Sequence, residues 1–74
     1  MARVIITFKD KATLMITGVC SAEFDDGYVI LEPEEDFENE YIDDIDIYNS
    51  RNTKENAPGC PTFRNVSSLE VYSD

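Results

Sequence analysis

The chain has 74 residues, 42% of them hydrophobic, and a formal net charge of -10 from sixteen acidic and six basic side chains. A chain this short buries only about 60% of the surface that it exposes when unfolded, so we expect one domain with one small core. The negative charge argues against nucleic acid and anionic membranes as direct ligands, because both are bound through Lys and Arg.

The N-terminal part of the sequence predicts a first β-hairpin. Residues 3–8, RVIITF, are β-branched and aromatic, and the same holds for ATLMIT at 12–17. The polar residues 9–11 between them are typical of a turn.

A second hairpin follows in the sequence. Asp26-Gly27 is a favoured two-residue hairpin turn, because both positions tolerate a positive φ. It would join a short strand near 22–25 to a strand at 28–31. Pro33 should end that strand, because proline cannot donate to the ladder.

Three hexapeptides share one pattern of apolar, two small or polar, apolar, acidic and apolar residues. They are VCSAEF at 19–24, IDDIDI at 42–47 and VSSLEV at 66–71. We interpret the pattern as a tight turn that leads into a short strand, used three times. It predicts strands near 44–48 and 68–72.

The middle of the chain carries mixed signals. Phe37, Tyr41, Ile45 and Tyr48 fall on one side of a helical wheel, whereas Ile45 and Ile47 alternate as in a strand. We predict a short helix within 34–42 followed by the strand, with a strand at 34–43 as the alternative. Residues 49–62, rich in Asn and Pro, predict a long loop.

The expected fold is therefore mainly β. It is a small antiparallel sheet or partial barrel of four to six strands, with one short helical segment and a long loop. Residues 1–74 form a single domain, within which 34–62 is an acidic insert and loop.

The sequence contains no His, which removes several common catalytic arrangements. Without His there is no Ser-His or Cys-His pair and no usual zinc site, and the three glycines form no phosphate loop. We expect no enzyme activity, no catalytic residue, no bound metal and no cofactor. Cys20 and Cys60 are either reduced, which the lack of an export signal favours, or bridged. A weak calcium site around Asp36, Glu38 and Glu40 is an alternative, although the stretch departs from the EF-hand pattern.

Acidic residues concentrate in one span of the chain. Residues 12–50 contain no Lys or Arg, and 34–46 hold eight carboxylates in 13 residues. That is one charge every ~2–3 Å in a helix or about 5 Å in a strand, comparable with the ~3.4 Å per charge of one DNA strand. The band is either a solvated face or a surface built to meet a basic partner. Like charges at neighbouring positions repel, and a small fold has little stability to lose.

Under the second interpretation, acids stand in for phosphates and aromatic residues interleave with them as anchors. The candidates for that role, or alternatively for the core, are Tyr28, Phe37, Tyr41 and Tyr48. A second contact with the partner is expected from Arg51 and Lys54. The predicted partner-binding residues are Glu34, Glu35, Asp36, Glu38, Glu40, Tyr41, Asp43, Asp44, Asp46 and Tyr48.

The chain has a small size, a strong negative charge, no recognised catalytic residues and an acid-aromatic band at 34–48. In these features it resembles the small acidic proteins by which phages and mobile elements inhibit host defence, namely the anti-CRISPR and DNA-mimic classes. The stretches VIITFKDKATLMITGV, DDGYVILEP and FRNVSSLEVYSD also resemble small β-sheet proteins of Gram-positive bacteria and their phages. The resemblance implies a β scaffold with an added functional insert at 34–62.

We therefore expect a non-enzymatic inhibitor that mimics nucleic acid and blocks a basic nucleic-acid-binding protein, such as a bacterial defence nuclease. The alternative is a small assembly module that self-associates through its sheet edges, as a homodimer. No segment reaches the ~18 apolar residues of a membrane span, and 1–11 do not read as a secretory signal. The expected location is the cytoplasm, that of the host cell if the protein is phage-encoded.

Overall fold

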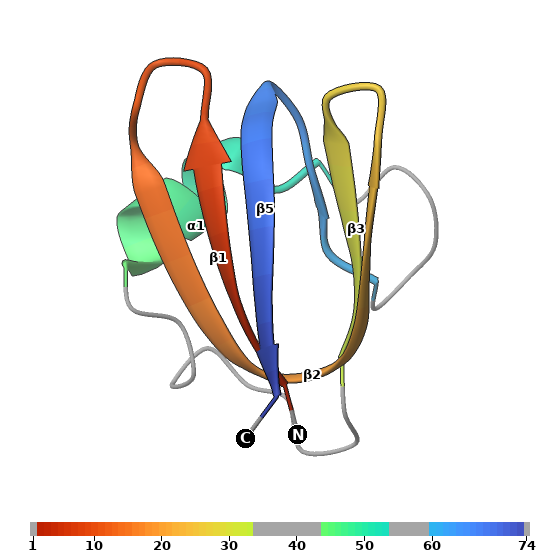
Figure 1. Cartoon of the computed structure of the whole chain (residues 1–74). Coiled ribbons are helices and arrows are strands. Elements are labelled where there is room, and N and C mark those ends of the chain that lie inside the picture. The colour runs from red at the N-terminus through yellow and green to blue at the C-terminus, as the bar shows by residue number, and fades with distance from the viewer. Residues whose placement is uncertain (1, 34–43, 54–59, 74) are drawn as a thin grey trace.

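The computed structural model describes residues 2–33, 44–53 and 60–73. The elements in chain order are β1 Ala2–Phe8, β2 Thr13–Asp25, β3 Tyr28–Pro33, α1 Ile45–Arg51, β4 Thr62–Phe63 and β5 Val66–Ser73. The five strands form one antiparallel sheet in the order β4-β3-β2-β1-β5 (Figure 1). The prediction of a mainly β protein with one short helix is confirmed.

Strand β2 shapes the sheet. Its first half pairs with β1 and its second half with β3, and the register shifts in both ladders near Val19. The prediction of two separate strands at 12–17 and 22–25 was wrong. Gly18 adopts a φ of 77°, which an L-residue rarely does, so the chain bends there without leaving the sheet.

The β2–β3 turn forms at Asp26-Gly27, as predicted, with φ values of 48° and 81°. The carbonyl of Gly27 accepts a 2.9 Å hydrogen bond from the backbone N–H of Val66, the first residue of β5. The sheet is thereby curled so far that the start of β5 reaches the tip of the β2–β3 hairpin.

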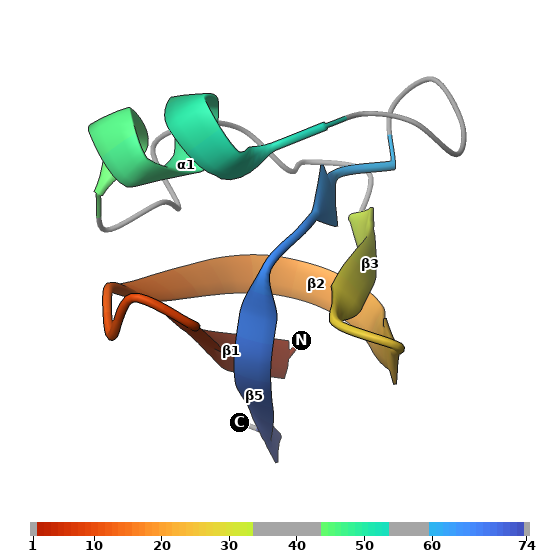
Figure 2. The same ribbon diagram turned by 90° about the horizontal axis from the view of Figure 1, so that it is seen from above.

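The core fills the inside of this curl. It consists of one face of the sheet, on which residues alternate with outward ones as the pleat requires. Helix α1 lies to one side of the curled sheet (Figure 2) and contributes Tyr48. The buried hydrophobic residues are Val4, Ile6, Phe8, Leu14, Ile16, Val19, Val29, Leu31, Tyr48, Phe63 and Val66.

The strand predicted at 44–48 is a helix. The carboxylate of Asp44 accepts a hydrogen bond from the N–H of Ile47 at 3.2 Å, which caps the helix start. Tyr48 then faces the core, Ile47 is half-buried and Ile45 is 38% exposed. The Ile45-Ile47 alternation was therefore misleading, whereas the helical-wheel signal was real in its second half. The helix predicted within 34–42 lies outside the described residues.

The loop predicted at 49–62 is shorter than expected at both ends, because α1 continues to Arg51 and β4 begins at Thr62. Its described ends are held together: the N–H of Thr53 donates to the carbonyl of Thr62, and the amide oxygen of Asn52 accepts from the N–H of Thr62.

The hexapeptide repeat does not correspond to one repeated structure. Residues 19–24 lie inside β2, the described part of 42–47 belongs to the start of α1, and 66–71 belong to β5. The strand predicted at 68–72 is nevertheless confirmed as part of β5.

Candidate partner-binding surface

The outer face of the β2–β3 hairpin is acidic and partly aromatic. Cross-strand partners share a face, and the pairs Asp25↔Tyr28, Glu23↔Ile30 and Ser21↔Glu32 alternate with pairs that include the buried Val29 and Leu31. Six side chains therefore point away from the core, Ser21 among them, and we call the other five the acidic hairpin face: Glu23, Asp25, Tyr28, Ile30 and Glu32.

The carboxylates of this face are spaced regularly, and no basic side chain of the described residues pairs with them. Glu23 and Asp25 are two residues apart on one strand, a separation of about 6.6 Å, and Glu32 is the diagonal neighbour of Glu23, ~7–8 Å away. All three are exposed. Within the described ranges, the one salt bridge joins Arg51 to Asp10. The three charges on the hairpin therefore stay open to an incoming cation.

Tyr28 supplies the aromatic component of this face. It is 41% exposed, and its strand partner is Asp25 at the turn. Ile30, half-buried, lies between Tyr28 and Glu32 on the same strand face. Aromatic side chains contribute strongly to protein interfaces because they bury much area at a small entropic cost. The face thus combines charge for attraction with an anchor for packing.

Three of the ten predicted partner-binding residues can be located. Asp44 and Asp46 are exposed, Asp44 as the cap of α1 and Asp46 in its first turn, where a negative charge also suits the helix dipole. Tyr48 takes the second of its two expected roles, because it is only 7% exposed and packs in the core. The others lie outside the described residues: Glu34, Glu35, Asp36, Glu38, Glu40, Tyr41 and Asp43.

Glu23, Asp25 and Glu32 were not among the contacts predicted from the sequence, although they lie within the span 12–50 that has no Lys or Arg. The signal was present in the strands themselves. In a strand, acidic residues that alternate with apolar ones point to the opposite face, so this pattern predicts the outward face of a hairpin. The contact residues were instead predicted at 34–46, because the acidic residues are densest there.

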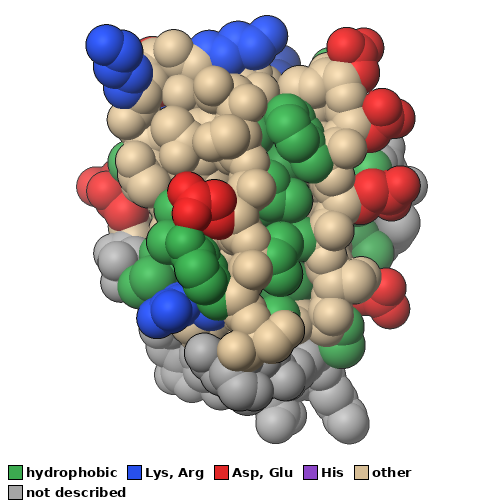
Figure 3. Space-filling model, in the orientation of Figure 1, with side chains coloured by type: hydrophobic (Ala, Val, Ile, Leu, Met, Phe, Trp, Pro, Cys, Tyr) green, Lys and Arg blue, Asp and Glu red, His purple; other side chains and the backbone are tan. Residues whose placement is uncertain are grey.

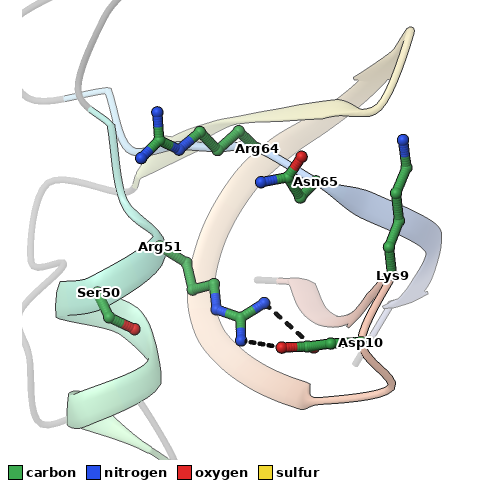
Figure 4. A pocket seen from close by; sticks show the side chains of 6 residues that line it. All are labelled: Lys9, Asp10, Ser50, Arg51, Arg64 and Asn65. Carbon is green, nitrogen blue, oxygen red and sulfur yellow. Dashed lines mark hydrogen bonds and ion pairs between the residues drawn. The ribbon is translucent and has the colours of Figure 1, made fainter.

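Positive charge gathers at a different place on the molecule. A pocket of about 390 Å³ lies where the β1–β2 and β4–β5 turns meet the end of α1 (Figure 4). It is lined by Lys9, Asp10, Ser50, Arg51, Arg64 and Asn65. In Figure 3 blue side chains gather at the top of the molecule and red ones along the side of the β2–β3 hairpin. The fold therefore separates a basic end from an acidic side.

Arg51 in this pocket is held by two groups. Its guanidinium donates two hydrogen bonds to the carboxylate of Asp10, one of them from Nη1 to Oδ1 at 3.2 Å, and it stacks over the ring of Phe8 at 4.7 Å. The hydrogen bonds from Arg51 lower the pKa of the Asp10 carboxyl below its ordinary value. Asp10 thus neutralises Arg51, and the pocket's unpaired charge comes from Lys9 and Arg64.

The remaining chemistry of the described residues is sparse. Both cysteines are free thiols, with Cys20 exposed and Cys60 half-buried. Across 2–33, 44–53 and 60–73, no group of three potential ligands could hold a metal ion, and the suspected calcium stretch around Asp36 lies outside these ranges. Nor does the described part of the chain contain a helix long and apolar enough to cross a membrane.

Comparison with known proteins gives no relative from which a role could be transferred: no family model, no curated protein and no solved structure matches this chain. What bears on function is the geometry of the acidic hairpin face and the charge distribution of the sequence.

Proposed function

We propose that this protein is a non-enzymatic inhibitor that presents carboxylates in place of phosphates and occupies the nucleic-acid site of a basic protein. The observation that carries the proposal is the acidic hairpin face, where Glu23, Asp25 and Glu32 project from a rigid hairpin without basic partners among the described residues. The proposed target class is a nucleic-acid-binding effector of bacterial defence, such as a nuclease.

The spacing of the charges supports mimicry over simple solubility. Two residues along a strand span about 6.6 Å, close to two steps of ~3.4 Å along one strand of DNA. All eight described carboxylates are exposed, and seven of them have no basic partner within the described ranges. A small domain needs a net charge of only about 2–8 for solubility, which this chain exceeds at -10.

Position within the fold also favours a contact role for the hairpin. Its two strands are fixed by the tight Asp26-Gly27 turn and by the bond from Val66 to Gly27, so the carboxylates are held in place before binding. Preorganised groups lose less entropy on association than groups on a flexible chain. The acids of 34–46 would add to the same negative field and raise the rate of encounter with a cationic groove.

The test is capture of a partner from bacterial lysate by the tagged protein at low salt, with identification by mass spectrometry. The wild type should retain a basic nucleic-acid-binding protein that added DNA releases. A variant carrying Glu23→Gln, Asp25→Asn and Glu32→Gln should retain at least tenfold less.

A matched control changes the net charge by the same three units elsewhere. Thr13→Lys, Asn49→Lys and Ser50→Lys alter exposed positions away from the acidic hairpin face. This control should lose much less capture than the neutralised variant. Equal capture by wild type and neutralised variant would contradict the proposal that these carboxylates bind the partner.

A further inference from the structure

An apolar strip lies exposed where the curled sheet fails to close. Strand β5 pairs with β1 on one side, and the second half of β2 pairs with β3. Among residues 2–33, 44–53 and 60–73, no strand pairing joins the facing edges of β5 and β2. Figure 3 shows a band of hydrophobic side chains that runs between β5 and the β2–β3 hairpin. We call this opening the seam.

The residues of the seam point toward the core side of the sheet but are not fully covered. On β5, Leu69 pairs with Ile6 and Val71 with Val4, whose side chains are buried. Leu69 is nevertheless only half-buried, and Val71 is 52% exposed.

The opposite wall of the seam follows the same pattern. On β2, Ala22 pairs with Leu31 and Phe24 with Val29, again residues of the core. Ala22 is half-buried and Phe24 is 44% exposed. Core-facing apolar residues are therefore still exposed on two facing strands. Together they form an apolar surface that the described residues leave partly uncovered.

Beyond Val66, whose N–H donates to the carbonyl of Gly27, the edge of β5 beside this strip pairs with no strand among the described residues. It has the features of a strand-addition site. An exposed edge offers a row of N–H and C=O groups to an extended chain, and pockets beside it accept every second side chain of the added strand. An added strand along β5 would place alternate side chains onto Leu69, Val71, Ala22 and Phe24. The two core-facing positions on each strand lie about 6.6 Å apart, the spacing of alternate side chains on an added strand.

Charge around the seam selects the kind of strand that fits. The outward side chains of an added strand would lie between Glu70 on β5 and Glu23 and Asp25 on β2, all of them exposed. Directly opposed like charges destabilise a strand pair, whereas opposite charges stabilise it. A second copy of this chain, paired through β5 about Glu70, would bring the two Glu70 carboxylates against each other, with the Arg3 guanidinium stacked on Tyr72 as the nearby cation of that face. The complementary occupant is a strand that alternates apolar residues with Lys or Arg.

We propose that the seam binds an extended segment of a basic partner by strand addition to β5, with apolar side chains directed inward and Lys or Arg outward. This inference rests on the proposed function and specifies part of the partner: the acidic hairpin face would attract the basic protein, and the seam would hold one of its strands. Strand addition requires an extended segment with free backbone N–H and C=O groups in the partner, whereas charge mimicry requires only a basic surface.

The test uses an eight-residue peptide of alternating Val and Lys with blocked termini, and a Val/Glu peptide as its counterpart. The Val/Lys peptide should bind in a fluorescence anisotropy titration and slow amide hydrogen exchange in β5 at least tenfold. The Val/Glu peptide should bind at least tenfold more weakly. No added protection in β5, or equal binding of the two peptides, would overturn the inference.

Variants that keep the charge constant separate the seam from the acidic hairpin face. Phe24→Asn with Val71→Asn should weaken the Val/Lys peptide at least tenfold, while Ile45→Asn, a comparably exposed apolar residue on α1, should change it less than twofold. Undiminished binding by the double variant would contradict the seam. Self-association of the wild type that the peptide does not displace would also overturn the inference, because a second copy would then occupy the edge.

The same double variant distinguishes failure of the seam from failure of the proposed function. If it captures the lysate partner as well as the wild type does, while the neutralised hairpin variant does not, the acidic surface stands and the seam inference is wrong. If neither variant loses capture, both are wrong.

Discussion

The ring of Tyr48 on α1 meets the ring of Phe63 on β4 edge to face, with the centroids 5.3 Å apart. Phe63 also contacts Phe8 of β1 in the same manner at 6.2 Å, so it links three elements that are distant in the sequence. Edge-to-face aromatic pairs add about 0.5–1.5 kcal/mol beyond the burial of their area. This cluster joins the helix to the sheet.

Replacement of Phe63 by Ala should therefore be severely destabilising. Phe63 is fully buried, and a Phe→Ala change in a core costs about 3–5 kcal/mol. That is a large part of the ~5–15 kcal/mol that stabilises a typical domain. Urea unfolding should show this loss, with a smaller one for Phe63→Leu, which keeps most of the volume. A loss below about 1 kcal/mol for Phe63→Ala would contradict the packing described here.

Removal of the helix cap should have a moderate effect. Asp44→Ala deletes the side chain that accepts the N–H of Ile47, and loss of such a cap costs about 0.5–2 kcal/mol. Asp46→Ala removes a neighbouring acid of the same helix that makes no cap bond, and it should cost less. Thermal unfolding followed by circular dichroism measures both. Equal effects would mean that charge near the helix start, not the cap bond, matters.

The Asp10–Arg51 pair should contribute pH-dependent stability. Because hydrogen bonds from Arg51 lower the pKa of Asp10 in the folded protein, the stabilisation is present at neutral pH. It disappears as the pH falls below the ordinary value of 3.8 and through the lowered folded pKa. Asp10→Asn should therefore be less stable than the wild type near pH 7, and the two should converge at low pH. The difference should also shrink in high salt, since the pair is exposed. A difference that persists unchanged below pH 3 would contradict this account.

The tip of the β2–β3 hairpin requires glycine at its second position. Gly27 has a φ of 81°, and an L-residue in the left-handed region costs about 1–2 kcal/mol. A Cβ at this position would meet only ordinary contacts, the nearest to Lys9 Nζ at 3.8 Å, so backbone strain should account for the loss in Gly27→Ala. Asp26→Gly should be close to neutral in chemical unfolding, because relief of strain at a φ of 48° offsets the added chain entropy. Equal stability of Gly27→Ala and the wild type would show that the turn adopts another geometry.

The sequence predicted the local elements of the fold better than their connections. The β-branched runs of β1 and β3 and the Asp26-Gly27 turn follow from short-range preferences, and all of them formed as expected. The single bent β2 did not follow, because Gly18 can end a strand or bend it, and pairing with β1 and β3 decides which. The helix at 45–51 was similarly hard to predict. It places Tyr48 against Phe63, a contact with a residue fifteen positions further along the chain.

The candidate site was predictable in its charge but not in its geometry. Composition identified an acidic surface, yet which carboxylates share a face depends on strand register, as for Glu23 and Glu32. The seam was not predictable at all. It exists because the curl of the sheet leaves Phe24 and Val71 exposed on two strands that are far apart in sequence. Only the three-dimensional arrangement brings these strands together.

The most direct test of the central claim is whether this protein and DNA exclude each other on the captured partner. The partner's binding to a labelled DNA duplex should be titrated with this protein at several salt concentrations. We expect complete competition, with an inhibition constant that weakens steeply as salt rises, because both ligands present regularly spaced negative charges to one basic surface. A stable ternary complex of partner, DNA and this protein would contradict nucleic-acid mimicry.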